Sequence, residues 1–403
     1  GERVQCVWPE GERMRIKAKS GISQLKLGLK QQGDWFVLQG EIRLDDGKVL
    51  QLRQLLELIK ASPGRFLKLN EHDWLALSSE LHKRLSELAH LADKVTDQGA
   101  RLSPLTAPLL ADLAGEVGEF KAGAQWQAHL AKLESLRTYQ PGLPSTLQAQ
   151  LRDYQLEGFA WLARLAHWGV GACLADDMGL GKTLQTICFL AWRAALNPPA
   201  KPGTVSLIVC PATLLHNWRL ELEKFAPELS SYIYHGGSRS LDVFFESGAK
   251  VMITSYGTLR SDSERFSAIQ WDTVVLDESH TIKNPTAQVT RAVYQLPAAA
   301  RIALSGTPVM NNTFDLYAQL HFLVPTLFGA QEFFRKEYAH PIDRDHDEEK
   351  IRALQQITAP FILRRTKQQV ATDLPPKTES VLWCSMAPDQ KALYEETCSQ
   401  IRD

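Results

Sequence analysis

The sequence lacks the features that mark several specialised classes of protein. Its six cysteines show no C-x-x-C pair and no ligand-spaced histidine, which argues against a disulfide framework or a zinc site. Three of them lie in apolar runs, where we expect reduced core thiols. No apolar run approaches the ~18 residues of a membrane span, and the start, GERVQCVWPE, lacks a signal peptide's apolar region. We therefore expect a cytoplasmic protein with no membrane partner.

A strong charge of either sign is also missing. The 45 Lys and Arg residues nearly balance 46 Asp and Glu, giving a formal net charge of -1. No global basic field indicates a nucleic-acid partner, so any such site must be a local patch. The 403 residues, 44% of them hydrophobic, suffice for two or three cores. Because the chain starts at Gly1 and stops in charged, helical-looking sequence, we expect a piece of a longer protein.

Residues 1–139 are predicted to form an accessory α+β domain that is mostly helical. Strand patterns occur around Arg13 to Lys19 and Trp35 to Leu44, and Asp46-Gly47 is a hairpin turn signal. Apolar residues at three- and four-residue spacing then mark the core faces of amphipathic helices. They are Leu52, Leu55, Leu56, Ile59, Leu77, Leu81, Leu85 and Leu88.

Residues 140–403 are predicted to form an α/β lobe, after a linker at Pro141-Gly142-Leu143-Pro144. Short β-rich runs alternate there with helical stretches, as in a parallel sheet between helices. The runs are Gly171 to Ala175, Val205 to Cys210, Tyr232 to Tyr234, Val251 to Thr254, Val274 to Leu276 and Ile302 to Leu304. Ligands of such sheets collect at the carboxyl ends of the strands, so the polar clusters after these runs are the candidate sites.

The stretch ADDMGLGKT follows one of these strands and precedes the helical run TLQTICFLAWRAAL. This is the strand, loop and helix context of a phosphate-binding loop, whereas the competing reading is a glycine-rich turn that caps a helix. In a phosphate loop, backbone amides form an anion nest at the start of the helix. Lys182 would reach the β- and γ-phosphates, and the Thr183 hydroxyl would bind Mg²⁺. The predicted nucleotide-binding residues are Met178, Gly179, Leu180, Gly181, Lys182 and Thr183.

Asp176 stands where the usual loop pattern begins with glycine, and Asp177 follows it. The first position ends the strand and does not require positive φ, so a side chain is allowed there if it turns away from the phosphates. Two carboxylates aimed at a triphosphate would cost several kcal/mol at partly buried distances. We therefore expect both to bond backbone or basic groups instead.

The segment VVLDESH supplies the predicted second half of the site. Asp277 and Glu278 follow an apolar strand that reads as buried. Asp277 would hold Mg²⁺ and Glu278 would orient or deprotonate the attacking water, with Lys182 neutralising charge on the phosphates. We predict these three residues to be catalytic; the competing reading is a solvated surface pair of acids.

The order DDMGLGKT, DESH and LSGTP resembles motifs I, II and III of superfamily-two helicases. Further stretches resemble the Swi/Snf family of double-stranded DNA translocases, over Leu151 to about Lys377. These stretches are LRDYQLEGFAWL, PATLLHNWRLELEKF, HGGSR, ITSYGTLR, DESHTIKN, SGTPVMNN and FILRRTK. The resemblance implies a first RecA-like lobe that uses ATP and Mg²⁺, with Gln155 reading the adenine. It also implies an association with the nucleoid if the host is bacterial.

The same resemblance implies a surface that tracks double-stranded DNA through phosphate contacts. The residues concerned are Thr213, Trp218, Ser255, Tyr256 and Asn311. Arg364 and Arg365, in the densest basic cluster of the chain, could also meet DNA phosphate; the alternative is a solvated charged turn. Ser305 and Thr307 match a motif thought to couple nucleotide to DNA, and His280 matches a residue that helps communication between lobes.

Two departures from the family pattern are Asp177 in place of glutamate and Thr281 in place of arginine. The resemblance also implies a second lobe with an arginine finger, for which nothing after Lys377 has the length. Because such an arginine can be worth about 10³ to 10⁵ in rate, we expect this chain to bind ATP far better than it hydrolyses it.

The leading hypothesis is thus the first motor lobe of a DNA-stimulated ATPase that moves along duplex and displaces or remodels bound protein. One alternative is a helicase that separates DNA or RNA strands. Another is a nucleotide-gated binding or scaffold module that docks an accessory protein on its N-terminal domain.

Overall fold

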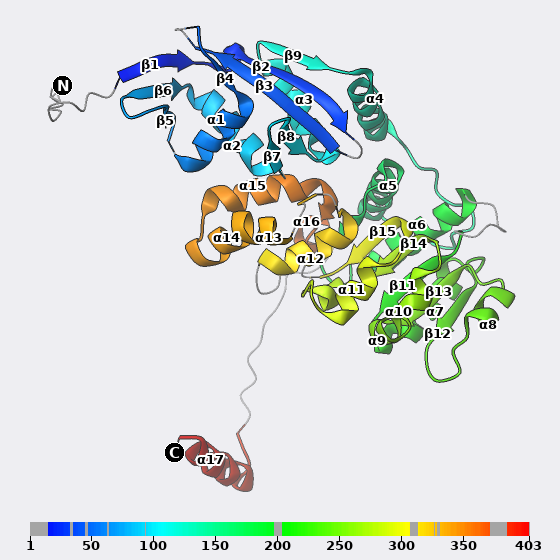
Figure 1. Cartoon of the computed structure of the whole chain (residues 1–403). Helices are drawn as coiled ribbons and strands as arrows, with labels where there is room; N and C mark the ends of the chain where they lie inside the picture. Colours follow the sequence, from blue (N-terminus) through cyan, green and yellow to red (C-terminus); the bar gives the residue numbers. More distant parts are fainter. Residues whose placement is uncertain are drawn as a thin grey trace. The chain divides into compact units, whose positions relative to one another are not determined.

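The computed structural model describes residues 15–32, 35–44, 47–62, 64–92, 94–196, 204–306, 313–325, 327–328, 331–370 and 385–402. The chain divides into two compact units, Gly1–Thr366 and Lys367–Asp403 (Figure 1). The second unit contains the helices α16 (Lys367–Val370) and α17 (Pro388–Arg402). The first unit contains all the sheets of the described part of the chain.

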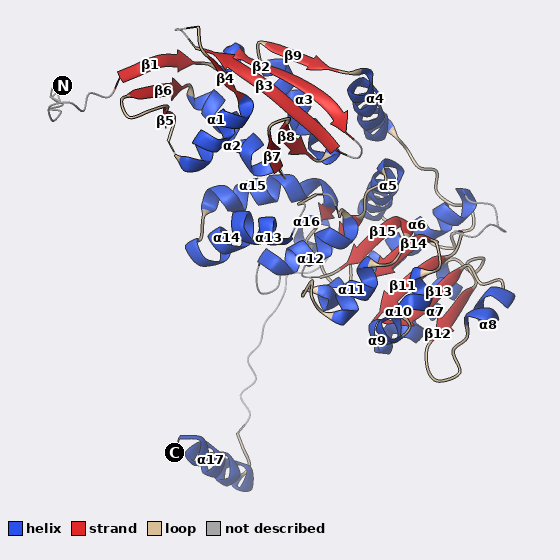
Figure 2. Ribbon diagram, in the orientation of Figure 1, coloured by secondary structure: helices blue, strands red, loops and turns tan. Residues whose placement is uncertain are grey.

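The N-terminal part of the first unit is α+β, as predicted, with more strand than the leucine spacing suggested (Figure 2). A six-stranded sheet has the order β7-β8-β3-β2-β9 with β4 paired to β3, and a three-stranded sheet has the order β1-β6-β5. The strands are β1 (Arg15–Ser20), β2 (Leu25–Gln32), β3 (Trp35–Arg43), β4 (Val49–Gln51), β5 (Phe66–Lys68), β6 (Asp73–Leu77), β7 (Lys94–Thr96), β8 (Gly99–Leu102) and β9 (Glu119–Ala122). The helices are α1 (Leu52–Ala61), α2 (Ser79–Leu91), α3 (Ala107–Glu116) and α4 (Ala124–Thr138).

The apolar spacing located the helices α1 and α2, whereas α3 and α4 were not predicted. All four predicted core residues of α1 are buried, and Leu81, Leu85 and Leu88 form the buried stripe of α2. Leu77 is an exception, because it ends β6 and lies in a strand. The predicted hairpin turn connects β3 to β4, where Gly47 has φ +81°; Asp46 lies outside the described residues.

The N-terminal part has its own hydrophobic core, which draws on β2, β3, α1 and α2 among other elements. The predicted linker at Pro141 to Pro144 is irregular, without helix or strand. The domain boundary between residues 139 and 140 stays a prediction.

The rest of the first unit is built on a seven-stranded parallel sheet with the order β12-β13-β11-β14-β15-β10-β16. The strands are β10 (Ala172–Leu174), β11 (Ser206–Cys210), β12 (Ser231–Tyr234), β13 (Val251–Ser255), β14 (Trp271–Leu276), β15 (Ala298–Leu304) and β16 (Ile362–Leu363). Six of them match the predicted runs closely. The seventh, β16, comes from the FILRRTK stretch and was not predicted.

Helices cover both faces of this sheet. Alternate residues of each strand enter two separate hydrophobic clusters, as the two-residue period of a strand requires. One cluster contains side chains of α5 (Asp153–Trp168), α6 (Lys182–Leu196) and α7 (Leu215–Phe225). The other contains side chains of elements from α8 (Leu241–Glu246) through α12 (Thr313–Leu323) to α15 (Glu348–Thr358). Between these ends lie α9 (Tyr256–Ser261), α10 (Ser263–Ser267), α11 (Gln288–Tyr294), α13 (Gln331–Phe334) and α14 (His340–Asp345).

Three cysteines lie in this core. Cys173, Cys188 and Cys210 are free and buried, as expected, and burial raises the pKa of each thiol to about 12. Cys6 and Cys384 lie outside the described residues. None of the helices in the described part of the chain has the length and apolarity that a bilayer crossing demands.

Candidate functional site

The polar motifs follow three neighbouring strands and lie at one edge of the sheet. β15 lies between β10 and β14, and Leu174 pairs with Leu304 while Leu276 pairs with Ala303. The phosphate loop after β10 and the acids after β14 therefore lie one strand apart, with Ser305 between them. The Ser305 amide donates to the Leu174 carbonyl at 3.3 Å. The prediction that loop and acids share this edge is confirmed.

The loop has the backbone of an anion nest. Gly179 and Gly181 have φ of +86° and +75°, a region that side chains rarely adopt. At Gly181 a Cβ atom would also lie only 2.4 Å from the Gln155 amide nitrogen, so this position requires glycine. α6 begins directly after it, at Lys182, and aims its positive end at the loop.

Lys182 turns its ammonium into the loop. Its Nζ donates to the Asp176 carbonyl at 2.7 Å and to the Asp177 carbonyl at 3.4 Å. Both acceptors are main-chain atoms at the start of the loop, so the ammonium is held beside the loop backbone. This is the position from which a lysine can bind phosphate oxygens.

The carboxylate of Asp176 points away from the nest. It is fully buried, accepting from the backbone amide and Nε of Arg365, each at 3.0 Å, and from Gln185 at 3.4 Å. The expectation that Asp176 bonds basic and backbone groups is confirmed. For Asp177, the backbone amide donates to the Arg365 carbonyl at 3.0 Å.

This arrangement corrects the prediction for Arg365 as a DNA contact. Its side chain is 11% exposed and forms an ion pair with Asp176. It also donates to the Tyr154 carbonyl and, at 2.9 Å, to the Gln185 side chain. A guanidinium that is committed to three internal acceptors cannot also meet a DNA phosphate. A sequence provides no signal for this pairing, because the partners lie 189 positions apart.

Gln155 lies at the start of α5, next to the loop. Its side chain accepts from the Arg152 amide at 3.0 Å and donates to the Leu180 carbonyl at 3.3 Å. It also donates to the Tyr154 hydroxyl at 3.4 Å. An amide side chain has two donors and two acceptor lone pairs, so these bonds leave one acceptor lone pair for a base. The adenine-reading role stays a prediction.

Asp277 is held from three sides. Trp218 Nε1 donates to its Oδ2 at 2.8 Å, the Glu278 amide donates to its Oδ1 at 2.9 Å, and the Tyr256 hydroxyl donates to its carbonyl at 2.8 Å. Burial raises the pKa of Asp277, against the hydrogen bonds from Trp218 and the Glu278 amide and the nearby Lys182 charge, which lower it. A nearby cation would favour its charged form.

The residues after Asp277 continue the site. Glu278 has a left-handed backbone, with φ +49°, which is uncommon outside glycine. His280 Nδ1 lies 3.2 Å from a Glu278 carboxylate oxygen, within ion-pair range if protonated but not aligned as a hydrogen bond. Ser279 donates to Gln319 of α12 at 2.9 Å, and both side chains are buried. The acidic segment is thereby tied to α12.

A model of the SNF2-related domain matches residues 154–402, which is more than half of the chain. The chain belongs to the SNF2-related family. It is 36% identical over 343 residues to the putative ATP-dependent helicase/translocase YwqA of Bacillus subtilis, covering 80% of this chain and 37% of that protein. It is 37% identical over 280 residues to the TATA-binding protein-associated factor mot1 of Schizosaccharomyces pombe, covering 64% and 14%.

Among solved structures, the SNF2-related chain resembles the SWI2/SNF2 ATPase core of Sulfolobus solfataricus in complex with dsDNA. The TM-score is 0.54 at 38% identity, covering 65% of this chain and 55% of that one. This likeness confirms the α/β fold class. The chain spans well under half the length of the two curated relatives.

The predicted DNA contacts of this SNF2-related chain fall into two groups. Trp218, Tyr256 and Ser255 are buried, at 1%, 6% and 5% exposure, so the prediction of side-chain contacts to DNA is wrong for them. The Ser255 hydroxyl caps α9 by accepting from the Thr258 amide at 3.2 Å. Thr213 and Arg364, by contrast, are exposed.

Three other predicted residues are located as follows. Asn311 and Thr307 lie outside the described residues. Met178, in the phosphate loop, is 73% exposed.

In the described part of the chain, no group of three or more His, Cys, Asp or Glu side chains is arranged to hold a metal ion. A magnesium ion would therefore depend on oxygen atoms of its ligand, on water and on few protein groups.

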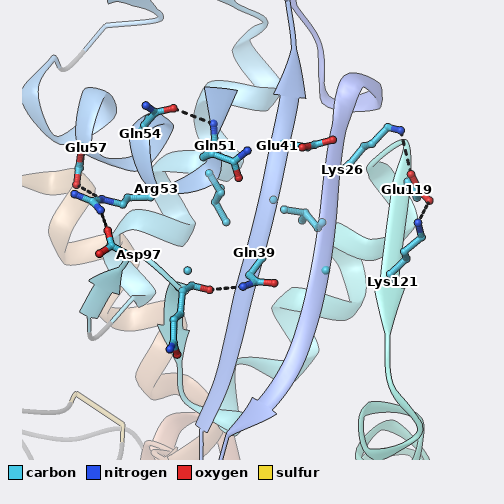
Figure 3. Close-up of a pocket in the computed structure, with 16 residues that line it drawn as sticks. Lys26, Gln39, Glu41, Gln51, Arg53, Gln54, Glu57, Asp97, Glu119 and Lys121 are labelled. Carbon is cyan, nitrogen blue, oxygen red and sulfur yellow. Dashed lines mark hydrogen bonds and ion pairs between the residues drawn. The ribbon is translucent and has the colours of Figure 1, made fainter. Parts of the chain in front are cut away.

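The N-terminal part of the chain contains a groove of about 810 Å³ between β2, β3, β9 and α1 (Figure 3). Its cations are already paired with its own acids. Lys26 and Lys121 both bond Glu119, at 3.2 and 2.7 Å, and Arg53 bonds Glu57 at 2.9 Å. The lining holds four acids and three cations, so the groove has no excess of positive charge that would favour a phosphate.

Proposed function

We propose that this chain is the ATP-binding lobe of a motor that moves along double-stranded DNA and displaces or remodels protein bound to it. One observation carries the proposal: the phosphate loop with Lys182 and the half-buried Asp277 lie one strand apart at the same edge of a parallel sheet. ATP would bind with its phosphates in the nest. Magnesium would neutralise phosphate charge there when bound.

The residues present fit a magnesium ion. The Thr183 hydroxyl follows the loop lysine, and the Asp277 carboxylate is fixed by Trp218 and by the next amide. Both offer oxygen, which this hard cation prefers. Lys182 would exchange its bonds to the loop carbonyls for phosphate oxygens. Glu278 would accept the proton of the attacking water.

Duplex DNA is the proposed track. The solved relative is titled as a complex with dsDNA, and Thr213 and Arg364 are exposed and suited to phosphate contacts. Thr213 follows β11, at the same edge of the sheet as the nucleotide site. Ser305, between the loop and the acids, would couple nucleotide to DNA, and His280 would assist communication with another lobe.

This chain alone is proposed to bind ATP with little turnover. The proposal rests on the arginine finger that the family resemblance implies on a second lobe, since the residues described after Thr366 form the helices α16 and α17 and add no strand to a sheet. Turnover near background, with or without duplex, is the expected result.

Titration of the chain with a fluorescent ATP analogue and Mg²⁺ tests the proposal. Wild type should bind, and Lys182→Ala should lose the binding. A wild type that does not bind the analogue, or a variant that binds it as tightly as wild type, would contradict the nucleotide site.

Binding of the nucleotide-loaded chain to matched duplex and single-stranded DNA tests the proposed DNA substrate, because a strand-separating helicase would prefer the single strand. If the protein acted only as a scaffold, Lys182→Ala would leave its biological activity in the cell intact.

A further inference from the structure

Arg365 joins the phosphate loop to the last residues of the first unit. It follows β16, the outermost strand on the β10 side of the sheet, and stands one residue before that unit ends at Thr366. We propose that Arg365 is a positioning residue of the nucleotide site, which holds the phosphate loop in its binding shape through Asp176. The inference rests on the proposed binding of ATP.

Asp176 connects Arg365 to Lys182 through its carboxylate and its backbone carbonyl. Its carboxylate accepts from Arg365, and its carbonyl accepts from Lys182 at 2.7 Å. Arg365, Asp176 and Lys182 therefore form one hydrogen-bonded chain. The orientation of the peptide that holds the Lys182 ammonium depends on the guanidinium behind it.

The backbone reinforces the same connection. The Ala175 amide donates to the Leu363 carbonyl at 2.7 Å, and the Asp177 amide donates to the Arg365 carbonyl at 3.0 Å. The Arg365 amide donates to the Asp176 carboxylate. Ala175, Asp176 and Asp177 are thus bonded in turn to the end of β16 and to Arg365, two residues after it.

Arg365 also reaches the helix that carries Gln155. It donates to the Tyr154 carbonyl, and its guanidinium carbon lies 5.3 Å from the centre of the Tyr154 ring. The Tyr154 hydroxyl in turn donates to the carbonyl of Leu180 in the loop, at 3.2 Å. The arginine therefore contacts both flanks of the loop.

Gly158, in the middle of α5, makes room for this network. A Cβ atom there would lie 1.9 Å from the Gln185 side-chain oxygen and 2.9 Å from an Arg365 nitrogen. Glycine inside a helix destabilises the helix relative to alanine. The cost is explained by the packing of Gln185 and Arg365 against the bare helix backbone.

The neighbouring arginine serves as an internal contrast. Arg364 is exposed, whereas Arg365 is 11% exposed and bonded to three acceptors. The two arginines of FILRRTK therefore have different roles, one directed to solvent and one to the nucleotide site. A lysine could not replace Arg365 fully, because it lacks the planar fork that reaches several acceptors at once.

Stability and positioning must be separated in the test. Removing Arg365 alone leaves the buried Asp176 unpaired, which destabilises a protein whatever the role of the pair. Replacing both partners by uncharged groups of similar size removes that penalty. The double variant Asp176→Asn with Arg365→Met therefore restores stability while leaving the loop without its anchor.

The experiment measures the Kd for a fluorescent ATP analogue with Mg²⁺, together with Tm, for wild type and four variants. Arg365→Ala should raise Kd at least tenfold and lower Tm, and Arg365→Lys should lie between it and wild type. The double variant should recover Tm but keep the raised Kd. Arg352→Ala, which removes a 70% exposed arginine from α15, should leave both values within twofold.

The outcomes separate this inference from the proposed function. A double variant whose Kd returns to the wild-type value along with Tm would show a structural role only. An unchanged Kd in Arg365→Ala would overturn the inference while the ATP site stands. If wild type itself fails to bind the analogue, both the proposed nucleotide site and the role of Arg365 are contradicted. Should Arg365→Ala fail to fold, the double variant and Arg365→Lys decide.

Discussion

The indole of Trp218 donates a 2.8 Å hydrogen bond to the carboxylate of Asp277. Trp218 comes from α7 and Asp277 from the end of β14, so the bond joins a helix on one face of the sheet to the acid at its edge. The acid predicted to bind magnesium is thus oriented by a residue that the sequence suggested for DNA.

Replacing Trp218 with phenylalanine keeps an aromatic ring in the core and removes the donor. The Asp277 carboxylate would then keep only the bond from the Glu278 amide. The magnesium-dependent part of ATP-analogue binding should therefore weaken by about tenfold, as expected for a lost hydrogen bond to a charged group. Titration of the analogue at a series of Mg²⁺ concentrations measures this. Binding of equal strength at every Mg²⁺ concentration would refute the orienting role.

Trp271→Phe is the matched control. Trp271 is equally buried and donates to the Phe266 carbonyl at 3.0 Å, but it begins β14 at the opposite end from Asp277. It should lower stability to a similar degree without changing the dependence on magnesium.

Arg364→Ala should weaken duplex binding by a similar factor for all sequences, because a phosphate contact carries no base information. The slope of log K against log salt should fall by about one. Fluorescence anisotropy of labelled duplexes across a salt series measures both, with Arg352→Ala as the control. An unchanged slope would leave Arg364 as a solvated side chain.

His321 predicts a pH dependence of stability. It lies in α12, 4.7 Å from the Tyr294 ring and 5.5 Å from the Tyr317 ring, and burial lowers its pKa from 6.5. Below pH 6.5 the unfolded chain therefore binds more protons than the folded chain, so the free energy of unfolding should fall as the pH drops from 6.5 toward the folded pKa.

Denaturant unfolding between pH 5 and 7.5 measures this effect, and His321→Phe should flatten the curve. Some slope should remain, because burial also lowers the pKa of His129. Parallel curves for the two proteins would show that folding leaves the pKa of His321 unchanged.

Sequence patterns predicted most of the features that depend on residues close together in the chain. The six strands, the phosphate loop and the acids at one sheet edge follow from apolar runs and from glycine, lysine and carboxylate positions. β16 escaped prediction because two residues are too few to form a pattern. The Asp176 partner escaped because it requires knowledge of the fold.

Some errors were avoidable. Leu215, Trp218 and Leu222 are spaced at three and four residues and form the buried stripe of α7, so the helical period already placed Trp218 inside. The Asp343 carboxylate accepts from the Thr313 amide at 3.0 Å at the start of α12, a contact that the sequence did not suggest. That contact spans 30 residues and has no local signature.

The two-residue strand β16 limits how far this lobe can be truncated from its C-terminal side. It covers one side of β10, the strand that leads into the phosphate loop. A chain cut before Ile362 would open that side to solvent and leave unpaired backbone groups, which invite pairing with other chains. Trimming from the C-terminal side beyond this point should yield aggregates, even though the loop, its lysine and the acids would all still be encoded.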